Sequence, residues 1–154
     1  MPNVGQAPTI VFTDPQSAEN AGASIARYAQ RAGDPRGVLN AARALLAENE
    51  AKVFDTSGSS IGESWPPHSP ATEDREVTGR LLVMSGHLRA ALTNPANAIV
   101  AHDTVELAPR GVAYAHFHIT GTSQMPARPM MGLSPETERG LVELLRVHLA
   151  TGIG

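Results

Sequence analysis

The sequence predicts an α+β fold in which a small antiparallel sheet packs against several α-helices. Apolar residues recur at helical spacing after Asp-Pro and Ser-Pro pairs, which commonly start helices. Two short apolar runs, residues 98–101 and 104–107, are separated by two residues, as in a β-hairpin. Pro126 and Pro129 fix the backbone at two points, so the segment before the last helix should be a stiff, extended arm.

Length and composition predict a single domain over residues 1–154, with a modest core. A chain of this size can bury about 68–70% of its unfolded surface. Only 4% of the residues are aromatic, so Ala, Leu and Val must form most of that core, and an oligomer would help to complete it. The absence of cysteine excludes disulfides, a thiolate nucleophile and a Cys-based zinc site.

The charge pattern argues against direct gripping of nucleic acid. The formal net charge is −3, and there is no run of Lys and Arg that would hold a phosphate backbone. Duplex DNA passing nearby, in passive contact, is compatible with this composition. No window approaches 18 consecutive apolar residues, and the N-terminus lacks the features of a signal peptide, so we expect no membrane contact. Nothing in the chain calls for a cofactor.

The first third of the chain should contain a flexible tail, a strand and two helices. Residues 1–8 are rich in Pro, Gly and Asn, which favour a loose tail. Residues 9–13 form a β-branched run, typical of a strand. A helix is predicted from Asp14-Pro15 to Gly33, and a longer one from Asp34-Pro35 to about Phe54.

Residues 55–68 are small and polar, and they predict a protruding loop. The only tryptophan, Trp65, lies near the end of this loop beside two prolines. Such a residue either folds back onto the core or anchors a partner. A short helix should follow at Ser69-Pro70 and end before Gly79.

The second half should contain a short helix within 81–92, with Leu88 and Leu92 facing inward, and then the hairpin. Residues 112–117 fit either a helical turn or a strand, because periodicity does not separate the two. A C-terminal helix should begin at Ser134. Four leucines should form one face of that helix: Leu141, Leu144, Leu145 and Leu149.

The best candidate for chemistry is the pair His116 and His118. On a strand both imidazoles would point to one face, where they could bind zinc together with His87, His102 or Asp103. The chain has no His-Glu-x-x-His motif and no Ser-His-Asp or phosphate-loop pattern. A metal-dependent enzyme is therefore the alternative hypothesis, and histidines in packing or at an interface are the favoured one.

Several short motifs in the second and last thirds of the chain resemble, in order and spacing, those of the phage virion morphogenesis, or tail completion, family of tailed bacteriophages. They are Phe54, then Trp65-Pro66-Pro67-His68-Ser69-Pro70-Ala71-Thr72, then Leu82-Val83-Met84-Ser85-Gly86-His87-Leu88-Arg89, then Tyr114-Ala115 with His118 and Gly121, and then Pro126-Ala127-Arg128-Pro129 with Gly132-Leu133-Ser134. The Pro-Ala-Arg-Pro element is the most specific of them, and the resemblance runs from about residue 50 to 150.

This resemblance implies a non-enzymatic, structural virion protein of the head–tail junction, assembled in the host cytoplasm. Such proteins form rings at the neck or tail top, commonly with six-fold symmetry, so the partners would be copies of the chain and other neck, connector, tail-tube or tail-terminator proteins. A non-viral adaptor is a further alternative. We expect the 56–68 loop and the 122–133 arm at subunit contacts, with Arg128 paired to a carboxylate. The interface candidates are Trp65, Pro66, His118, Pro126, Arg128, Pro129 and Met130.

Overall fold

A computed structural model describes residues 23–24, 26–27, 29–73, 79–101 and 103–152. The chain divides into two units after Asp34, and they are described separately. In the first unit the described residues before Asp34 are helical, and this helix ends at Gly33, as predicted. The predicted tail at 1–8, the predicted strand at 9–13 and the predicted helix start at Asp14-Pro15 lie outside the described residues.

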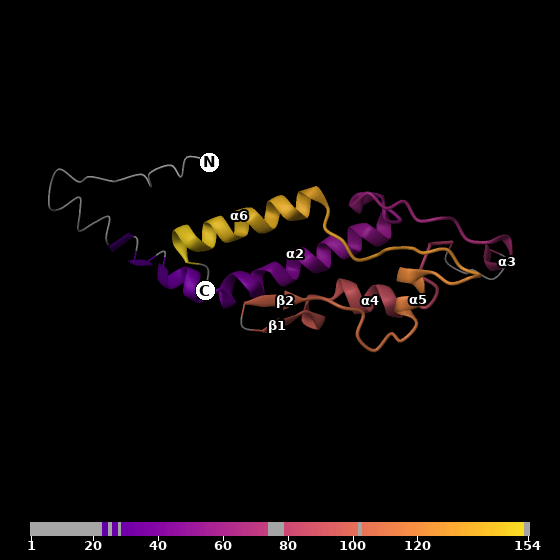
Figure 1. Ribbon diagram of the computed structural model, residues 1–154, viewed down its shortest axis with the longest axis horizontal. Coiled ribbons are helices and arrows are strands. Elements are labelled where there is room, and N and C mark those ends of the chain that lie inside the picture. The colour runs from indigo at the N-terminus through magenta and orange to yellow at the C-terminus, as the bar shows by residue number, and fades with distance from the viewer. Residues whose placement is uncertain (1–22, 25, 28, 74–78, 102, 153–154) are drawn as a thin grey trace, which may run out of the picture. The chain divides into compact units, whose positions relative to one another are not determined.

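Helix α2 (Arg36–Asp55) is the element on which the second unit is built. It confirms the helix predicted from Asp34-Pro35 to about Phe54. Helix α6 (Pro135–Thr151) packs along one side of it and runs antiparallel to it, while helix α4 (His87–Thr93) packs on another side (Figure 1). Lys52 near the end of α2 forms an ion pair with Glu136 at the start of α6, with 2.9 Å between Nζ and Oε2.

A two-stranded antiparallel sheet completes the fold. Strands β1 (Ile99–Ala101) and β2 (Thr104–Glu106) pair with Val100 opposite Val105, and both contact α2. This confirms the predicted hairpin and the α+β fold. Arg43 of α2 contacts the 3₁₀ turn η2 (Pro95–Asn97), which precedes β1. Its guanidinium donates hydrogen bonds to the carbonyls of Pro95 and Ala96.

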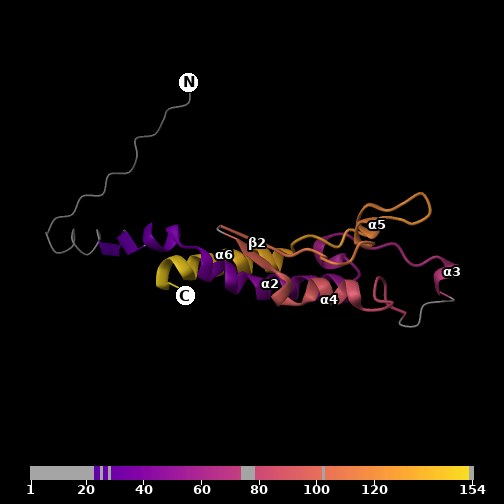
Figure 2. The same ribbon diagram turned by 90° about the horizontal axis from the view of Figure 1, so that it is seen from below.

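The short elements gather at the other end of α2. These are the 3₁₀ turn η1 (Ser59–Ile61), helix α3 (Pro70–Glu73) and helix α5 (Ala115–Thr120). Figures 1 and 2 place α3 and α5 beyond the point where α2 ends, whereas the hairpin lies beside its first half. Periodicity left open whether residues 112–117 form a helical turn or a strand: residues 115–117 belong to α5, and none of the segment is a strand.

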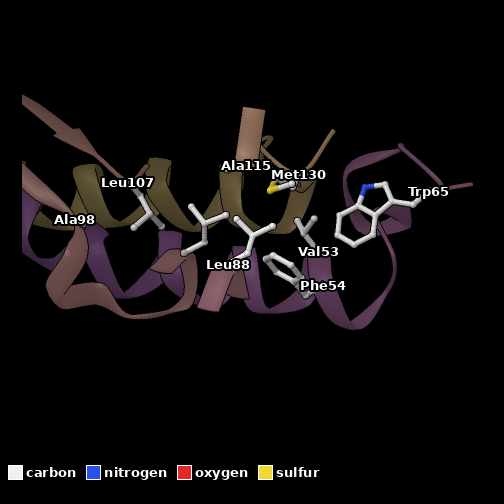
Figure 3. Close-up of a cluster of buried hydrophobic side chains, with 9 residues drawn as sticks. Val53, Phe54, Trp65, Leu88, Ala98, Leu107, Ala115 and Met130 are labelled. Carbon is white, nitrogen blue, oxygen red and sulfur yellow. The ribbon is translucent and has the colours of Figure 1, made fainter. Parts of the chain in front are cut away.

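The main core cluster is formed by apolar side chains from α2, α4, α5, the hairpin region, the loop after α2 and the arm. Figure 3 shows how they meet. Val53, Leu92 and Met130 are fully buried. Leu88 and Leu92 face inward as predicted. The members are Val53, Phe54, Trp65, Leu88, Leu92, Ala98, Leu107, Ala115 and Met130.

Helix α6 begins as predicted, and three of the four leucines of its predicted face are partly buried. Ser134 caps it, and the Ser134 hydroxyl accepts a hydrogen bond from the amide of Thr137 at 3.1 Å. Of the predicted leucine face, Leu145 is 47% exposed, and the buried positions of the helix are Thr137 and His148. The leucine face is therefore only partly turned toward α2.

Candidate assembly surface

The arm over residues 122–133 is fastened to the loop segment 65–67, which is distant in sequence. The Arg128 guanidinium donates from Nε to the Pro66 carbonyl at 3.0 Å and from Nη2 to the Pro67 carbonyl at 2.9 Å. The Arg128 amide donates to the His118 carbonyl at 2.6 Å. One arginine thus ties together the arm, the loop and α5.

Within the subunit the guanidinium of Arg128 meets carbonyl oxygens and not the carboxylate that we predicted. Arg128 is only 5% exposed, and no described carboxylate forms an ion pair with it. Burial lowers the pKa of Arg128, yet a guanidinium stays protonated in proteins. Carbonyl dipoles satisfy donors but do not neutralise the charge, so among the described residues this buried cation has no counter-ion.

Trp65 folds back onto the core, which was one of its two predicted positions. Its indole ring meets the Phe54 ring edge to face, with 5.6 Å between the centroids and an angle of 82° between the planes. The indole Nε1–H donates to the carbonyl of Pro129 at 2.6 Å. Trp65 and Arg128 therefore make reciprocal bonds, each from one segment to the backbone of the other.

The loop that carries Trp65 begins as a compact turn. The Gly58 amide donates to the Val53 carbonyl at 2.8 Å, and the Trp65 amide donates to the Ser57 carbonyl at 2.8 Å. Gly58 has a φ of +84°, and a Cβ on it would lie 1.8 Å from the carbonyl oxygen of Glu63. Only glycine fits this position, and its small size lets the chain return Trp65 to the core.

Asn49 holds the end of the arm, and sequence reasoning missed it. Its amide nitrogen donates to the Gly132 carbonyl at 2.7 Å, and its amide oxygen accepts from the Ser134 amide at 3.0 Å. Asn49 is 1% exposed. The position of Asn49 could have indicated this role, because it places a polar residue on the apolar stripe of the predicted helix, between Ala42 and Val53.

Glu50, the next residue of α2, is a buried acid. Desolvation raises its pKa to about 7, and a hydrogen bond from Asn49 opposes this rise. That bond joins Asn49 Nδ2 to Glu50 Oε1 at 3.3 Å, and Oε2 is buried with no partner among the described residues. Near neutral pH a large fraction of Glu50 therefore carries a proton.

An open, mostly apolar groove of about 870 Å³ lies beside the fastened arm. Its walls come from four segments, which are 68–72, 82–88, 114–118 and 122–128. Pro126 lines it and is exposed, whereas Met130 is buried in the core behind the arm. Large apolar side chains of the groove lie open to solvent: Met84 is 60% exposed, Tyr114 43% and Phe117 47%.

His118 and His116 do not form the pair that a strand would have given. They lie two residues apart on α5, so their side chains point about 200° apart around the helix. His118 lines the groove, and its ring meets Tyr114 edge to face at 5.9 Å, while His116 Nδ1 lies 3.0 Å from the Ala113 carbonyl. In the part of the chain that the structure describes, no three His, Asp or Glu residues are grouped to hold a metal ion.

His118 is partly buried and lies close to the charge of Arg128. Desolvation lowers the pKa of His118, and the nearby Arg128 guanidinium lowers it further. Nδ1 of His118 is buried and has no hydrogen-bond partner among the described residues. Of the described residues that line the groove, none supplies a counter-charge to the Arg128 guanidinium, which lies beside a largely neutral imidazole.

A second exposed apolar surface lies away from the groove, on α6. Val142 is 69% exposed and Leu145 47%, and residues four and three apart lie on one side of a helix. Between the arm and α6, Met131 and Leu133 are also about two-fifths exposed, at 40% and 41%. The chain thus presents two different apolar surfaces to solvent.

An ion cluster at the end of α2 was also absent from the predictions. The carboxylate of Asp55 pairs with the guanidinium groups of Arg80 and Arg89, the latter at 3.0 Å. All three side chains are at least 31% exposed. The cluster joins the end of α2 to the turn before α4 and to α4 itself.

Comparison with known proteins identifies the family. Searches of curated proteins and of solved structures gave no match. No helix in the described ranges is both long and apolar enough to span a membrane. The profile of the phage virion morphogenesis family matches residues 16–150, which include all the segments that fasten the arm and line the groove. The chain belongs to the phage virion morphogenesis family, and its role is that of a bacteriophage structural or morphogenesis protein.

Proposed function

We propose that this protein completes the phage tail at the head–tail junction, where copies of it form a ring, with six-fold symmetry as the expected arrangement. Its neighbours would be copies of itself and neck, connector, tail-tube or tail-terminator proteins, with DNA passing through the lumen. The family match over residues 16–150 is the observation that carries the proposal.

The surface of the chain supports assembly through unlike faces. A closed ring requires a heterologous interface, in which one face of a subunit meets a different face of the next. The chain carries an apolar groove on one surface and exposed Val142 and Leu145 on another. Exposed apolar surfaces of this kind commonly mark sites of protein association.

The test is an infection in which the gene is disrupted and supplied in trans. Without the protein we expect filled heads and separate tails to accumulate. With a C-terminally tagged copy, electron microscopy should show the tag as a ring of density at the junction. Normal particles in the absence of the protein, or a tag located elsewhere in the virion, would contradict the proposal.

A pair of arginine variants tests the predicted contribution of the arm. Arg128→Ala removes both bonds to the loop, so the arm should lose its position and the yield of complete particles should fall. Arg110→Ala is the matched control, because the ion pair of Arg110 with Glu106 is an exposed i,i+4 pair. Complete particles at normal yield with Arg128→Ala would show that the arm is not needed for assembly.

A further inference from the structure

We infer that the groove of one subunit receives the outer face of helix α6 from the next copy, and that Glu138 of that helix approaches the buried Arg128. This inference rests on the proposed ring. It specifies which two surfaces form the repeated contact.

The groove has the chemistry of a site for an acidic apolar helix. Its rim is apolar, through Met84, Tyr114 and Phe117. None of the described residues that line it carries a carboxylate, whereas Arg128, 95% buried, lies in its floor. A buried cation without a counter-ion is costly, and an arriving carboxylate would remove that cost.

The outer face of α6 is the matching surface on the same chain. Glu138, Val142 and Leu145 follow at spacings of four and three residues, so they lie along one stripe of the helix. All three are exposed. Glu138 has no ion-pair partner among the described residues, whereas Glu136 is paired with Lys52 and Glu143 with Arg146.

A subunit cannot easily fill its own groove. Helices α3 and α5, which contribute to two of the groove walls, lie beyond the point where α2 ends, whereas α6 starts near that point and runs back alongside α2, away from the groove walls (Figures 1 and 2). A helix laid in a groove through anchors at these spacings is a common recognition mode. When the helix and the groove belong to different copies, the contact is heterologous and can repeat around a ring.

The first experiment uses crosslinking in assembled virions, because the chain contains no cysteine. A copy with both Met84→Cys and Val142→Cys should give a ladder of dimers and larger species with a short bis-maleimide crosslinker. Each single variant should give no ladder, and Ile99→Cys with Val142→Cys is the matched control, since Ile99 is 46% exposed on β1. Protein present in the virion without any groove-to-α6 crosslink would overturn the inference and leave the proposed ring intact. Virions that lack the protein altogether would instead refute the proposed function.

The second experiment mixes two variants that each lose one half of the contact. Phe117→Asp places a charge on the groove rim, and Val142→Asp places one on α6. Each should lower self-association roughly 30-fold or more, as for loss of an interface hot spot. The Phe117→Asp variant keeps an intact α6, and the Val142→Asp variant keeps an intact groove, so one copy of each can bind in the mixture. The two surfaces left free in that dimer are the altered ones, so the dimer should grow no further. Larger assemblies formed by either variant alone at normal yield would contradict the proposed contact, and circular dichroism of each checks that the fold is intact.

Discussion

The fastened side of the arm and the groove beside it differ in how their side chains are used. At the fastening points Trp65, Asn49 and Arg128 are nearly fully buried, and each donates a hydrogen bond to a backbone carbonyl. At the groove, Met84 and Phe117 are about half exposed and contribute little to the core. The difference separates residues that hold the shape of the subunit from residues that are available for contact with a neighbour.

This comparison predicts two kinds of variant. A change at Trp65 or Asn49, which do not line the groove, should lower the free energy of unfolding, and any loss of assembly should follow from that. A change at the groove rim or on the outer face of α6 should leave the free energy of unfolding within about 0.5 kcal/mol and reduce assembly directly. A groove-rim variant that loses as much free energy of unfolding as a core variant would contradict this distinction between the two regions.

The largest effect is expected for Trp65→Ala. The variant loses the contact with the Phe54 ring and the bond to Pro129, and it leaves a large cavity, so the free energy of unfolding should fall by about 3–5 kcal/mol. Chemical denaturation followed by circular dichroism measures this, since the variant lacks the only tryptophan. Tyr114→Ala, at a 43% exposed aromatic, is the control and should change stability little.

The second largest loss in the free energy of unfolding is expected for Asn49→Ala. It leaves the Gly132 carbonyl and the Ser134 amide without the side chain that pairs both, and each unpaired buried backbone group is costly. We expect a loss of about 2–4 kcal/mol in the free energy of unfolding. Asn40→Ala is a matched control because Asn40 is exposed on the same helix. Equal losses for the two asparagines would show that Asn49 does not fasten the arm.

Glu50→Gln should remove a pH dependence of the free energy of unfolding. The pKa of Glu50 is about 7 in the folded chain, against the ordinary glutamate pKa of 4.5 that applies when the chain is unfolded. Between these values the folded chain keeps a proton that the unfolded chain has lost, so its free energy of unfolding should fall by about 2–3 kcal/mol as pH rises from 4.5 to 7.

The difference between wild type and Glu50→Gln, measured by denaturation from pH 4.5 to 8, isolates this contribution. His118 acts with the opposite sign, because its lowered pKa costs stability as pH falls below 6.5, and the subtraction removes it. Glu48→Gln, at an exposed position of the same helix, is the matched control. A pH profile that is the same in wild type and Glu50→Gln would show that the carboxyl is solvated when folded.

The smallest effect is expected for Asp55→Asn. The variant removes both ion pairs, with Arg80 and Arg89, but all the partners are partly exposed. Exposed pairs contribute little, so the loss should be no more than about 1 kcal/mol and should shrink as salt is added. A larger loss that persists at high salt would mean that this cluster belongs with the fastening points.

The elements could be predicted from the sequence because their signals are local. The hairpin followed from two apolar runs and a two-residue connection, and α2 and α6 followed from apolar spacing and from the Asp-Pro and Ser-Pro starts. The choice between strand and helix for 115–120 required tertiary contacts. The exposure of Leu145 on α6 was missed because only the packing against α2 decides which of the leucines are covered.

The fastening could be predicted only in part. The prolines and Arg128 marked the arm, but the partners of Arg128 are carbonyl oxygens, which are present at every residue and leave no signal in the sequence. The groove was not predicted at all, because its four walls come from segments up to about 60 residues apart. The interface roles predicted for Trp65, Pro66, His118, Pro126, Arg128, Pro129 and Met130 remain predictions, although Trp65, Arg128 and Met130 are buried within the subunit.

The bonds from Trp65 and Arg128 to main-chain oxygens also bear on how this protein can change. A donor that contacts only the peptide group places no demand on the side chain opposite, so position 67 can be replaced freely as long as the chain keeps its path. Comparison of related sequences should then show little coupled variation between position 128 and positions 66 and 67. Methods that infer spatial proximity from paired changes would overlook this junction, although it is among the tightest in the subunit.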